Sequence, residues 1–318
     1  MRLKLISLSI LAAMTFSSCT KTDTFSPKAS EIVVQAGVAQ TRAGYDVNNL
    51  PSAFVMDVLQ NSDPKYDYRN IKMIKNGSIY SPESSDVKML WAGSAYSSVE
   101  VKAMTIPYGM ETVDADASMN LQVSIDQSQV TQLEASDVLW AKDGDISLSD
   151  GIIEISFKHL LSKLDITYVL SGLTKEDISF ESVKLKGVCT GGGFSYADMQ
   201  FDPSVAASKG DVNMYHDSEA DKFEAVFFPY IPEAGSNPVL LVEATIFGKP
   251  CTLSCSISPK SSSGFESGKR YSMKVTVNHT SISTETITID AEWGNGNDDL
   301  VINPDVDVEM GDDTFITA

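Results

Sequence analysis

Apolar and polar residues alternate with a period of two along much of this chain, and this alternation limits the folds that it can adopt. The pattern is clear in residues 119–125, 271–277 and 287–293. Because successive side chains of a strand point to opposite faces, each stretch predicts a strand with one buried and one solvated face. Many short strands of this kind indicate antiparallel sheets packed as sandwiches or barrels. The predicted fold class is therefore all-β.

Turn signals separate the predicted strands, and helical patterning is scarce. The turn signals are Asn76-Gly77, Asp143-Gly144-Asp145, Ser149-Asp150-Gly151, Gly191-Gly192-Gly193, residues 261–264 and Asn295-Gly296. The three consecutive glycines are interpreted as a hairpin or loop. Only residues 128–133, 157–164 and 174–180 could form a helical turn or two, and the second of these is ambiguous by period.

The first nineteen residues have the pattern of a lipoprotein signal. Arg2 and Lys4 are followed by a mostly apolar run to Phe16, then two serines and Cys19. This order is typical of a secretory signal peptide and is too short for a membrane-spanning helix. A cysteine directly after small residues predicts lipid attachment at Cys19. The alternative is an ordinary signal peptide with a cysteine there by chance.

The length of the chain is enough for two domains of ordinary size. A series of turns ends near Gly151, and a new apolar block starts at Ile152. We therefore place the division near residue 150, within about twenty residues either way. The predicted layout is a signal peptide (1–18), a tether with a removable strand (19–45), two tandem antiparallel β-sandwich domains (46–150 and 151–299) and an acidic extension (300–318).

Composition limits the partners of the chain. The formal net charge is -19, and a surface this acidic repels nucleic acid and anionic lipid headgroups. No second apolar run is long enough to span a bilayer, so we expect membrane attachment only through the lipid.

The remaining cysteines do not predict a disulfide framework. Cys189, Cys251 and Cys255 are odd in number. Cys251 and Cys255 lie four residues apart on one face of a predicted strand, roughly 13 Å from each other, which is beyond disulfide reach. We expect them to pack as small apolar residues.

Alternation also marks both ends of the mature chain. Ile32, Val34 and Ala36 share one face of a predicted strand, and the polar stretch that follows offers a trypsin-like protease a site between Arg42 and Ala43. A second such stretch occurs near the C-terminus, where apolar residues alternate with acidic ones; these are Val306, Val308 and Met310. A terminal strand needs a partner sheet, in its own molecule or in another. The alternatives are that 31–38 stays in its own sheet and that 300–318 is a frayed tail.

No pattern of catalytic, metal-binding or cofactor-binding residues stands out. His159 lies in an apolar block and is interpreted as a structural histidine. The Asp143-Gly144-Asp145 segment fits no calcium loop and is interpreted as a solvated turn. Trp91, Trp140 and Trp293 lie beside alternating apolar residues, which indicates core packing. The chain is thus predicted not to be an enzyme and to use no metal or cofactor.

Several segments, in this order and spacing, are similar to those of a known family. They are Cys19, Thr41-Arg42-Ala43, Met89-Leu90-Trp91, residues 99–108, Asp137-Val138-Leu139-Trp140-Ala141, residues 157–164, residues 265–271 and residues 289–293. On these residues the chain resembles the fimbrillin-like (Mfa-like) surface lipoproteins of Bacteroidales, which are subunits and accessory proteins of protease-matured (type V) pili.

The resemblance implies two transthyretin-like β-sandwich domains and a surface-exposed lipoprotein of the outer membrane. It also implies cleavage after Arg42, release of the strand that carries Ile32, Val34 and Ala36, and filling of the vacated groove by a strand of another fimbrial subunit. Val306, Val308 and Met310 are then the candidate donor strand. Backbone hydrogen bonds would complete the sheet while alternate apolar side chains fill pockets.

The expected function is therefore a non-catalytic fimbrial subunit or fimbria-associated adhesin that presents its surface to host or bacterial ligands. The alternative is a monomeric surface lipoprotein that binds glycans through exposed aromatic residues.

Overall fold

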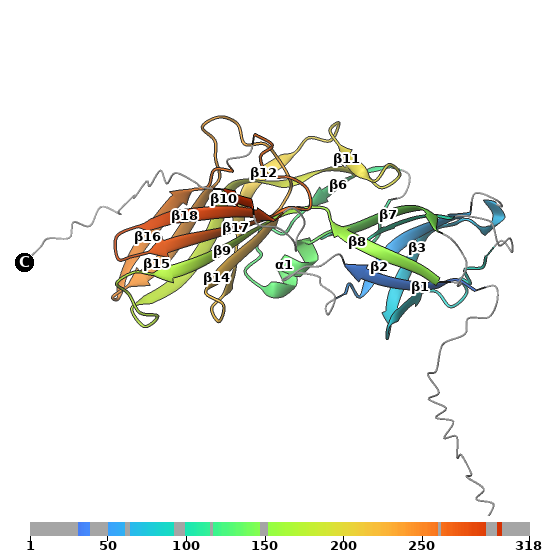
Figure 1. The fold of residues 1–318 in the computed structure, drawn as a ribbon, viewed down its shortest axis with the longest axis horizontal. Helices are drawn as coiled ribbons and strands as arrows, with labels where there is room; N and C mark the ends of the chain where they lie inside the picture. Colours follow the sequence, from blue (N-terminus) through green and yellow to red (C-terminus); the bar gives the residue numbers. More distant parts are fainter. Residues whose placement is uncertain are drawn as a thin grey trace, which may run out of the picture.

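The computed structural model describes residues 31–38, 50–60, 64–91, 99–114, 117–146, 152–259, 262–290 and 298–300. Within these ranges the chain is mostly strand, with one short α-helix, α1 (Val130–Ser136), and one 3-10 turn, η1 (Pro64–Tyr66). The all-β prediction is confirmed. The strands form one closed barrel and two further sheets, arranged end to end (Figure 1). No helix in the described ranges is long and apolar enough to cross a membrane.

Seven strands close into a barrel at one end of the molecule. In order around the barrel they are β1 (Val33–Val38), β4 (Ile79–Pro82), β3 (Tyr68–Asn76), β2 (Ala53–Gln60), β5 (Val99–Met104), β7 (Leu139–Ile146) and β8 (Ile152–His159). Alternate residues fill the interior: Phe54, Met56 and Val58 of β2 are fully buried there. The alternation that predicted the strands thus also defines the core of the barrel.

The other end of the molecule contains two six-stranded sheets. One consists of β6 (Ser118–Gln122), β10 (Ile178–Ser195), β11 (Gln200–Asp202), β12 (Ser208–Asn213), β15 (Val239–Ile246) and β16 (Lys249–Ser256). The other consists of β13 (Tyr215–Asp217), β14 (Lys222–Phe227), β9 (Ser162–Leu170), β17 (Arg270–Val277), β18 (Ile282–Asp290) and β19 (Asp298–Leu300). A shared apolar core packs between them, with Leu164 and Ile166 of one sheet and Leu240 and Val242 of the other.

The predicted division near residue 150 lies ahead of β8, and β8 belongs to the barrel through β1 and β7. The chain leaves the barrel for the last time between His159 and Ser162. In addition, β6 comes from the first half of the sequence but pairs with β10 in the second sheet. Sheet membership therefore does not follow sequence order.

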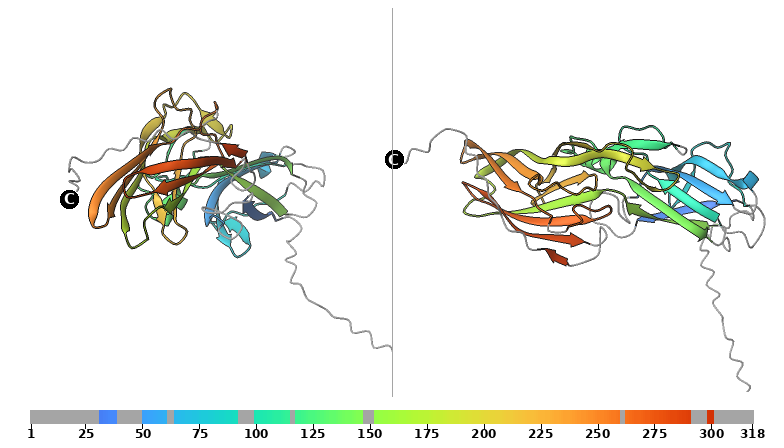
Figure 2. Two further views of the ribbon diagram at one scale, coloured as in Figure 1. Left: turned by 60° about the vertical axis from the view of Figure 1, so that its left-hand side comes forward. Right: turned by 90° about the horizontal axis from the view of Figure 1, so that it is seen from above.

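The long strand β10 connects the two ends of the molecule. Residues 178–186 pair with β15, and residues 191–195 pair with β6 on the side nearer the barrel. Figure 2 shows this strand running along the molecule. The glycines 191–193, predicted to form a turn, lie within it. A Cβ at Gly193 would come within 2.5 Å of the Asp202 carbonyl oxygen, so glycine is required here for close strand approach rather than for a turn.

One further local prediction was wrong, and one ambiguous segment is now assigned. Residues 143–145 lie in β7, where the register with β5 shifts between Val99 and Val101; a β-bulge, not a turn, accommodates the glycine. Residues 157–164 form the end of β8 and the start of β9. The predicted helical segment 128–133 overlaps α1, whereas 174–177 is a turn that leads into β10.

A third apolar cluster, called the junction cluster below, joins the barrel to the second sheet. Tyr196, directly after β10, is fully buried, and its hydroxyl group donates a hydrogen bond to the Lys102 carbonyl oxygen of β5 (3.2 Å). The Lys102 ammonium in turn donates to the Ala197 carbonyl oxygen (2.6 Å). Burial raises the pKa of nearby Asp57, whose carboxylate accepts a hydrogen bond from Asn70 N–H. These contacts join the barrel and the adjoining sheet into one body.

The third sheet carries charged side chains on the face opposite to its core. Lys163 and Asp165 of β9 are only 1% and 2% exposed, and they alternate with the core residues of that strand. Asp165 lies 3.3 Å from the Lys163 ammonium, 3.0 Å from that of Lys222 and 2.6 Å from Arg270 Nε. Burial alone would raise the pKa of Asp165, but the three positive charges outweigh it and lower that pKa below its ordinary value.

Asp165 is expected to make stability depend on pH at the acid end. Because its folded-state pKa lies below the unfolded value of about 3.9, its stabilisation is complete above that value and is lost as the pH falls through the folded-state pKa. Asp165→Asn should lower the free energy of unfolding at pH 7 by about 3 kcal/mol, since Arg270 loses its carboxylate partner and Lys163 and Lys222 then share the single charge of Glu224. Urea unfolding at pH 7 and between pH 2 and 5 measures both effects. Exposed Asp86→Asn is the control, and equal stability of the two variants would contradict the assignment.

Gly193→Val is expected to cost several kcal/mol, in the range of overpacked core substitutions. Its side chain would overlap Asp202 and Val205, and the register between β10, β6 and β11 would have to change. Thermal unfolding measures the loss. Gly144→Val is the matched control, because a Cβ there has no neighbour within 4 Å. A similar melting temperature for the two variants would exclude close approach as the reason for glycine 193.

Candidate functional site

The strand β1, at the start of the described chain, is the element that the sequence singled out for function. Ile32 and Val34 are buried in the barrel core, at 7% and 0% exposure, and Ala36 packs against the same cluster. These residues therefore share the inward face that their spacing predicted. Their strand is fully integrated in a sheet of its own molecule.

The hydrogen-bonded neighbours of β1 are unequal. On one side it runs parallel to β8 over six residue pairs, from Val33–Ile152 to Val38–Phe157. On the other side it pairs with β4 only at Val34–Tyr80, and Ile32 N–H donates to the Met89 carbonyl oxygen (2.9 Å). β1 is thus held mainly by β8, and its contact with β4 closes the barrel.

The position of β1 in the chain determines whether a single peptide cleavage could separate it from the barrel. Only a terminal strand can be separated from a barrel by one peptide cleavage. The segment between β1 and β2 contains Arg42 and Ala43, which lie outside the described residues, as do Cys19, Val306, Val308 and Met310. For these six residues the roles predicted from the sequence stay predictions.

The space that β1 fills between β4 and β8 is called the β1 slot below, and its floor is apolar and aromatic. The Phe54 ring lies 4.8 Å from the Tyr80 ring and 5.1 Å from the Phe157 ring, centroid to centroid. The Tyr80 hydroxyl group donates to the Pro51 carbonyl oxygen (2.7 Å), and burial raises the pKa of Tyr80 to about 12. Tyr80 therefore stays neutral and presents an apolar ring to β1. Without β1, this floor would be exposed to water.

The other described residues that the sequence raised as candidates are packed or hydrogen-bonded within the fold. His159 is buried, with its Nδ1 atom 2.9 Å from Asp137 Oδ1. Trp91 and Trp140 pack partly buried against the barrel core and the junction cluster, whereas Trp293 lies outside the described residues. The cysteines of the second sheet, Cys189 and Cys255, are buried, Cys251 is partly buried, and all three are free thiols.

Among the described residues, no group of three or more His, Cys, Asp or Glu could hold a metal ion. Sequence reasoning did not identify the Asp137–His159 pair, because the two residues are 22 positions apart and meet only when β7 and β8 pair. The one available signal was a histidine inside an apolar block.

Val34→Ala is expected to reduce the free energy of unfolding of the uncleaved protein by about 2 kcal/mol, because it removes fully buried apolar surface from the barrel. Gln35→Ala, on the other face of the same strand, is the control and should change stability by less than about 0.5 kcal/mol. Urea unfolding with fluorescence detection measures both. Equal effects at the two positions would mean that the inward face of β1 adds nothing to barrel stability.

Comparisons with known proteins agree with this architecture. The profile of the family described as fimbrillin-like matches residues 41–293. A candidate cell adhesion protein from Bacteroides uniformis has a similar structure, with a TM-score of 0.62, 18% identity and coverage of 83% of this chain and 97% of that one. Another from Bacteroides ovatus has a TM-score of 0.59, 15% identity and coverage of 87% and 99%. No curated protein matches by sequence.

Proposed function

Because the chain belongs to the fimbrillin-like family, whose members are structural proteins rather than enzymes, we propose that it is a cell-surface fimbrial subunit or fimbria-associated adhesin that assembles by protease-triggered strand exchange. Membership of this family confirms the prediction that the chain is not an enzyme.

The observation that carries the mechanism is the position of β1: the first strand of the described chain, it closes a barrel and is held by six pairs to one neighbour and by one pair to the other. Cleavage between Arg42 and Ala43 would leave β1 attached only by non-covalent contacts. Its departure would expose the aromatic floor of the β1 slot and the unpaired backbone of β8. An exposed apolar slot beside an open strand edge favours binding of a strand from another subunit.

The remaining steps follow the order of the sequence. Lipid on Cys19 would carry the chain to the outer membrane, and cleavage would free the folded part from its tether. The segment with Val306, Val308 and Met310 is the candidate donor, since its apolar residues have the same spacing as Ile32, Val34 and Ala36. Such a strand would have to run parallel to β8, as β1 does.

We also propose that the barrel and the two remaining sheets correspond to the two tandem transthyretin-like sandwich domains of the family, with the division between His159 and Ser162. The core inside the barrel and the core between the other two sheets support two units. The junction cluster would then transmit tension along a fibre, because it joins the units through buried side chains.

Arg42→Ala is expected to abolish trimming by an arginine-specific protease and with it the ladder of polymers that unheated surface extracts show in gel electrophoresis. The chain has four arginines, and exposed Arg69 offers a control. Arg69→Ala should leave trimming and the ladder unchanged. A ladder that persists in Arg42→Ala would overturn cleavage as the trigger.

A single band from the trimmed wild-type protein would instead indicate a monomer. In that case the glycan-binding lipoprotein becomes the better interpretation of the same fold.

A further inference from the structure

The hairpin that joins β15 to β16 turns at the end of the molecule remote from the barrel. Ile246 of β15 pairs with Lys249 of β16, so its loop contains only Phe247 and Gly248. Ile246 also pairs with Ile178 at the start of β10, whereas the other end of β10 pairs with β6, nearer the barrel. Figure 1 shows β15 and β16 at the end opposite to β1, β2 and β3. The two loop residues and Lys249 are called the hairpin tip below.

Phe247 is an unusual residue for this turn. The φ angles of Phe247 and Gly248 are 50° and 74°, and a two-residue type I′ loop requires positive φ at both positions. Asparagine and glycine tolerate such angles, whereas a bulky side chain there is strained. The Phe247 side chain is also 61% exposed, the highest value among the described aromatic residues. Folding thus gains little from this ring, and strain that folding does not need is typical of binding sites.

The exposed ring is held on a rigid support. The Phe247 N–H group donates a hydrogen bond to the Asp177 carbonyl oxygen (2.8 Å), in the turn that leads into β10. The Asp177 carboxylate in turn accepts hydrogen bonds from the N–H and hydroxyl groups of Thr174 (2.7 Å each). A rigid, protruding aromatic ring is a typical anchor of protein interfaces, because little conformational entropy is lost when it is buried. Its complement is an apolar pocket wide enough for a phenyl ring.

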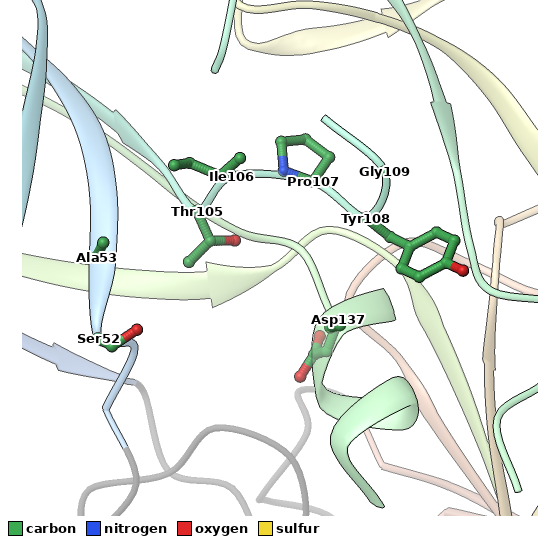
Figure 3. Close-up of a pocket in the computed structure, with 9 residues that line it drawn as sticks. Ser52, Ala53, Thr105, Ile106, Pro107, Tyr108, Gly109 and Asp137 are labelled. Carbon is green, nitrogen blue, oxygen red and sulfur yellow. The ribbon is translucent and has the colours of Figure 1, made fainter. Parts of the chain in front are cut away.

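The same chain contains such a pocket. A cavity of about 310 Å³ opens between the start of β2, the segment after β5 and α1. Its lining includes Ala53, Ile106, Pro107 and Ala135. Figure 3 shows Ile106 and Pro107 along one side of this space, between Ala53 and Tyr108. Because an apolar cavity of about 150 Å³ already accepts benzene, the ring of a phenylalanine fits here.

The cavity can be reached from solvent. Its lining residues Ser52, Tyr108, Gly109 and Ala135 are exposed, and Ile106 is half-buried. An incoming ring therefore meets apolar surface without any rearrangement of the fold.

Charge favours a second copy of the chain as the partner. The formal net charge of -19 makes most surfaces of two copies repel each other. The hairpin tip is an exception, because its one charged residue is the exposed Lys249. No described lysine, arginine or histidine lines the cavity, and Glu111, two residues beyond the lining residue Gly109, is exposed. The tip of one copy thus matches the cavity of another in size, polarity and charge.

We propose that the hairpin tip of one copy docks into this cavity of a second copy, with the Phe247 ring as the anchor against Ile106, Pro107 and Ala135. The tip and the cavity are separate surfaces, so each copy can bind one neighbour through its tip and another through its cavity. A heterologous contact of this kind generates an open row of subunits, or a ring where the rotation closes. The contact goes beyond the proposed function, because it joins folded subunits without cleavage or strand exchange.

The experiment uses the full chain with Cys19→Ser and Arg42→Ala, called the parent chain, so that neither lipid nor strand exchange can cause association. Sedimentation velocity at increasing protein concentration should show reversible association beyond the dimer. Phe247→Asn should weaken association by about tenfold or more and should also raise the melting temperature, since Asn-Gly is the favoured pair of a type I′ loop. Ile231→Ala removes a different exposed apolar side chain and should associate as the parent chain does.

A second pair of variants tests the cavity. Ala135→Phe places a ring in the cavity from α1 and should weaken association by about tenfold or more. Thr131→Phe adds the same ring at an exposed position of α1 that does not line the cavity, and should associate as the parent chain does. If Phe247→Asn fails to fold, this pair still decides the question.

Mixing the two defective variants tests whether the contact is heterologous. Phe247→Asn keeps its cavity and Ala135→Phe keeps its hairpin tip, so an equimolar mixture should form dimers and no longer species, while each variant alone stays monomeric. A symmetrical contact between two tips or two cavities would leave the mixture monomeric. The proposal is overturned by a monomeric mixture, by a parent chain that is monomeric at every concentration, or by either variant associating as tightly as its control.

Discussion

The structure depends on the closure of a seven-stranded barrel by its first strand. A barrel removes the unpaired strand edges that an open sheet exposes, but only while every strand is present. Here β1 satisfies the backbone of β8 along six residue pairs and covers the aromatic floor made by Phe54, Tyr80 and Phe157. The same contacts that stabilise the uncleaved chain would become a binding surface in a chain that had lost β1. On the proposed mechanism, stability and assembly would therefore depend on one set of interactions.

The pairings of β1 with β8 and with β4 differ in what they determine. The parallel seam with β8 sets the direction and register of whatever occupies the β1 slot, because a shift by one residue would turn its apolar face outward. The short contact with β4 at Val34–Tyr80 adds little backbone pairing, so the barrel is weakest there. Opening at β4 would leave β1 attached along β8, and a strand entering at the open seam could displace it progressively. If strands exchange as proposed, the unequal pairing of β1 with its two neighbours would favour stepwise exchange over complete release followed by capture.

The sequence predicted the strands well, because alternation is a local signal, and the inward face of β1 was correct residue by residue. It could not predict sheet membership. The pairing of β6 with β10 joins residues about seventy positions apart, and β8 joins the barrel through β1, more than a hundred positions earlier. The structural role of the glycines was also ambiguous in the sequence. Gly191-Gly192-Gly193 has the composition of a turn, but it lies in a strand, where a side chain at Gly193 would overlap Asp202 and Val205. The Asp137–His159 pair escaped prediction for the same reason, since it depends on the pairing of β7 with β8.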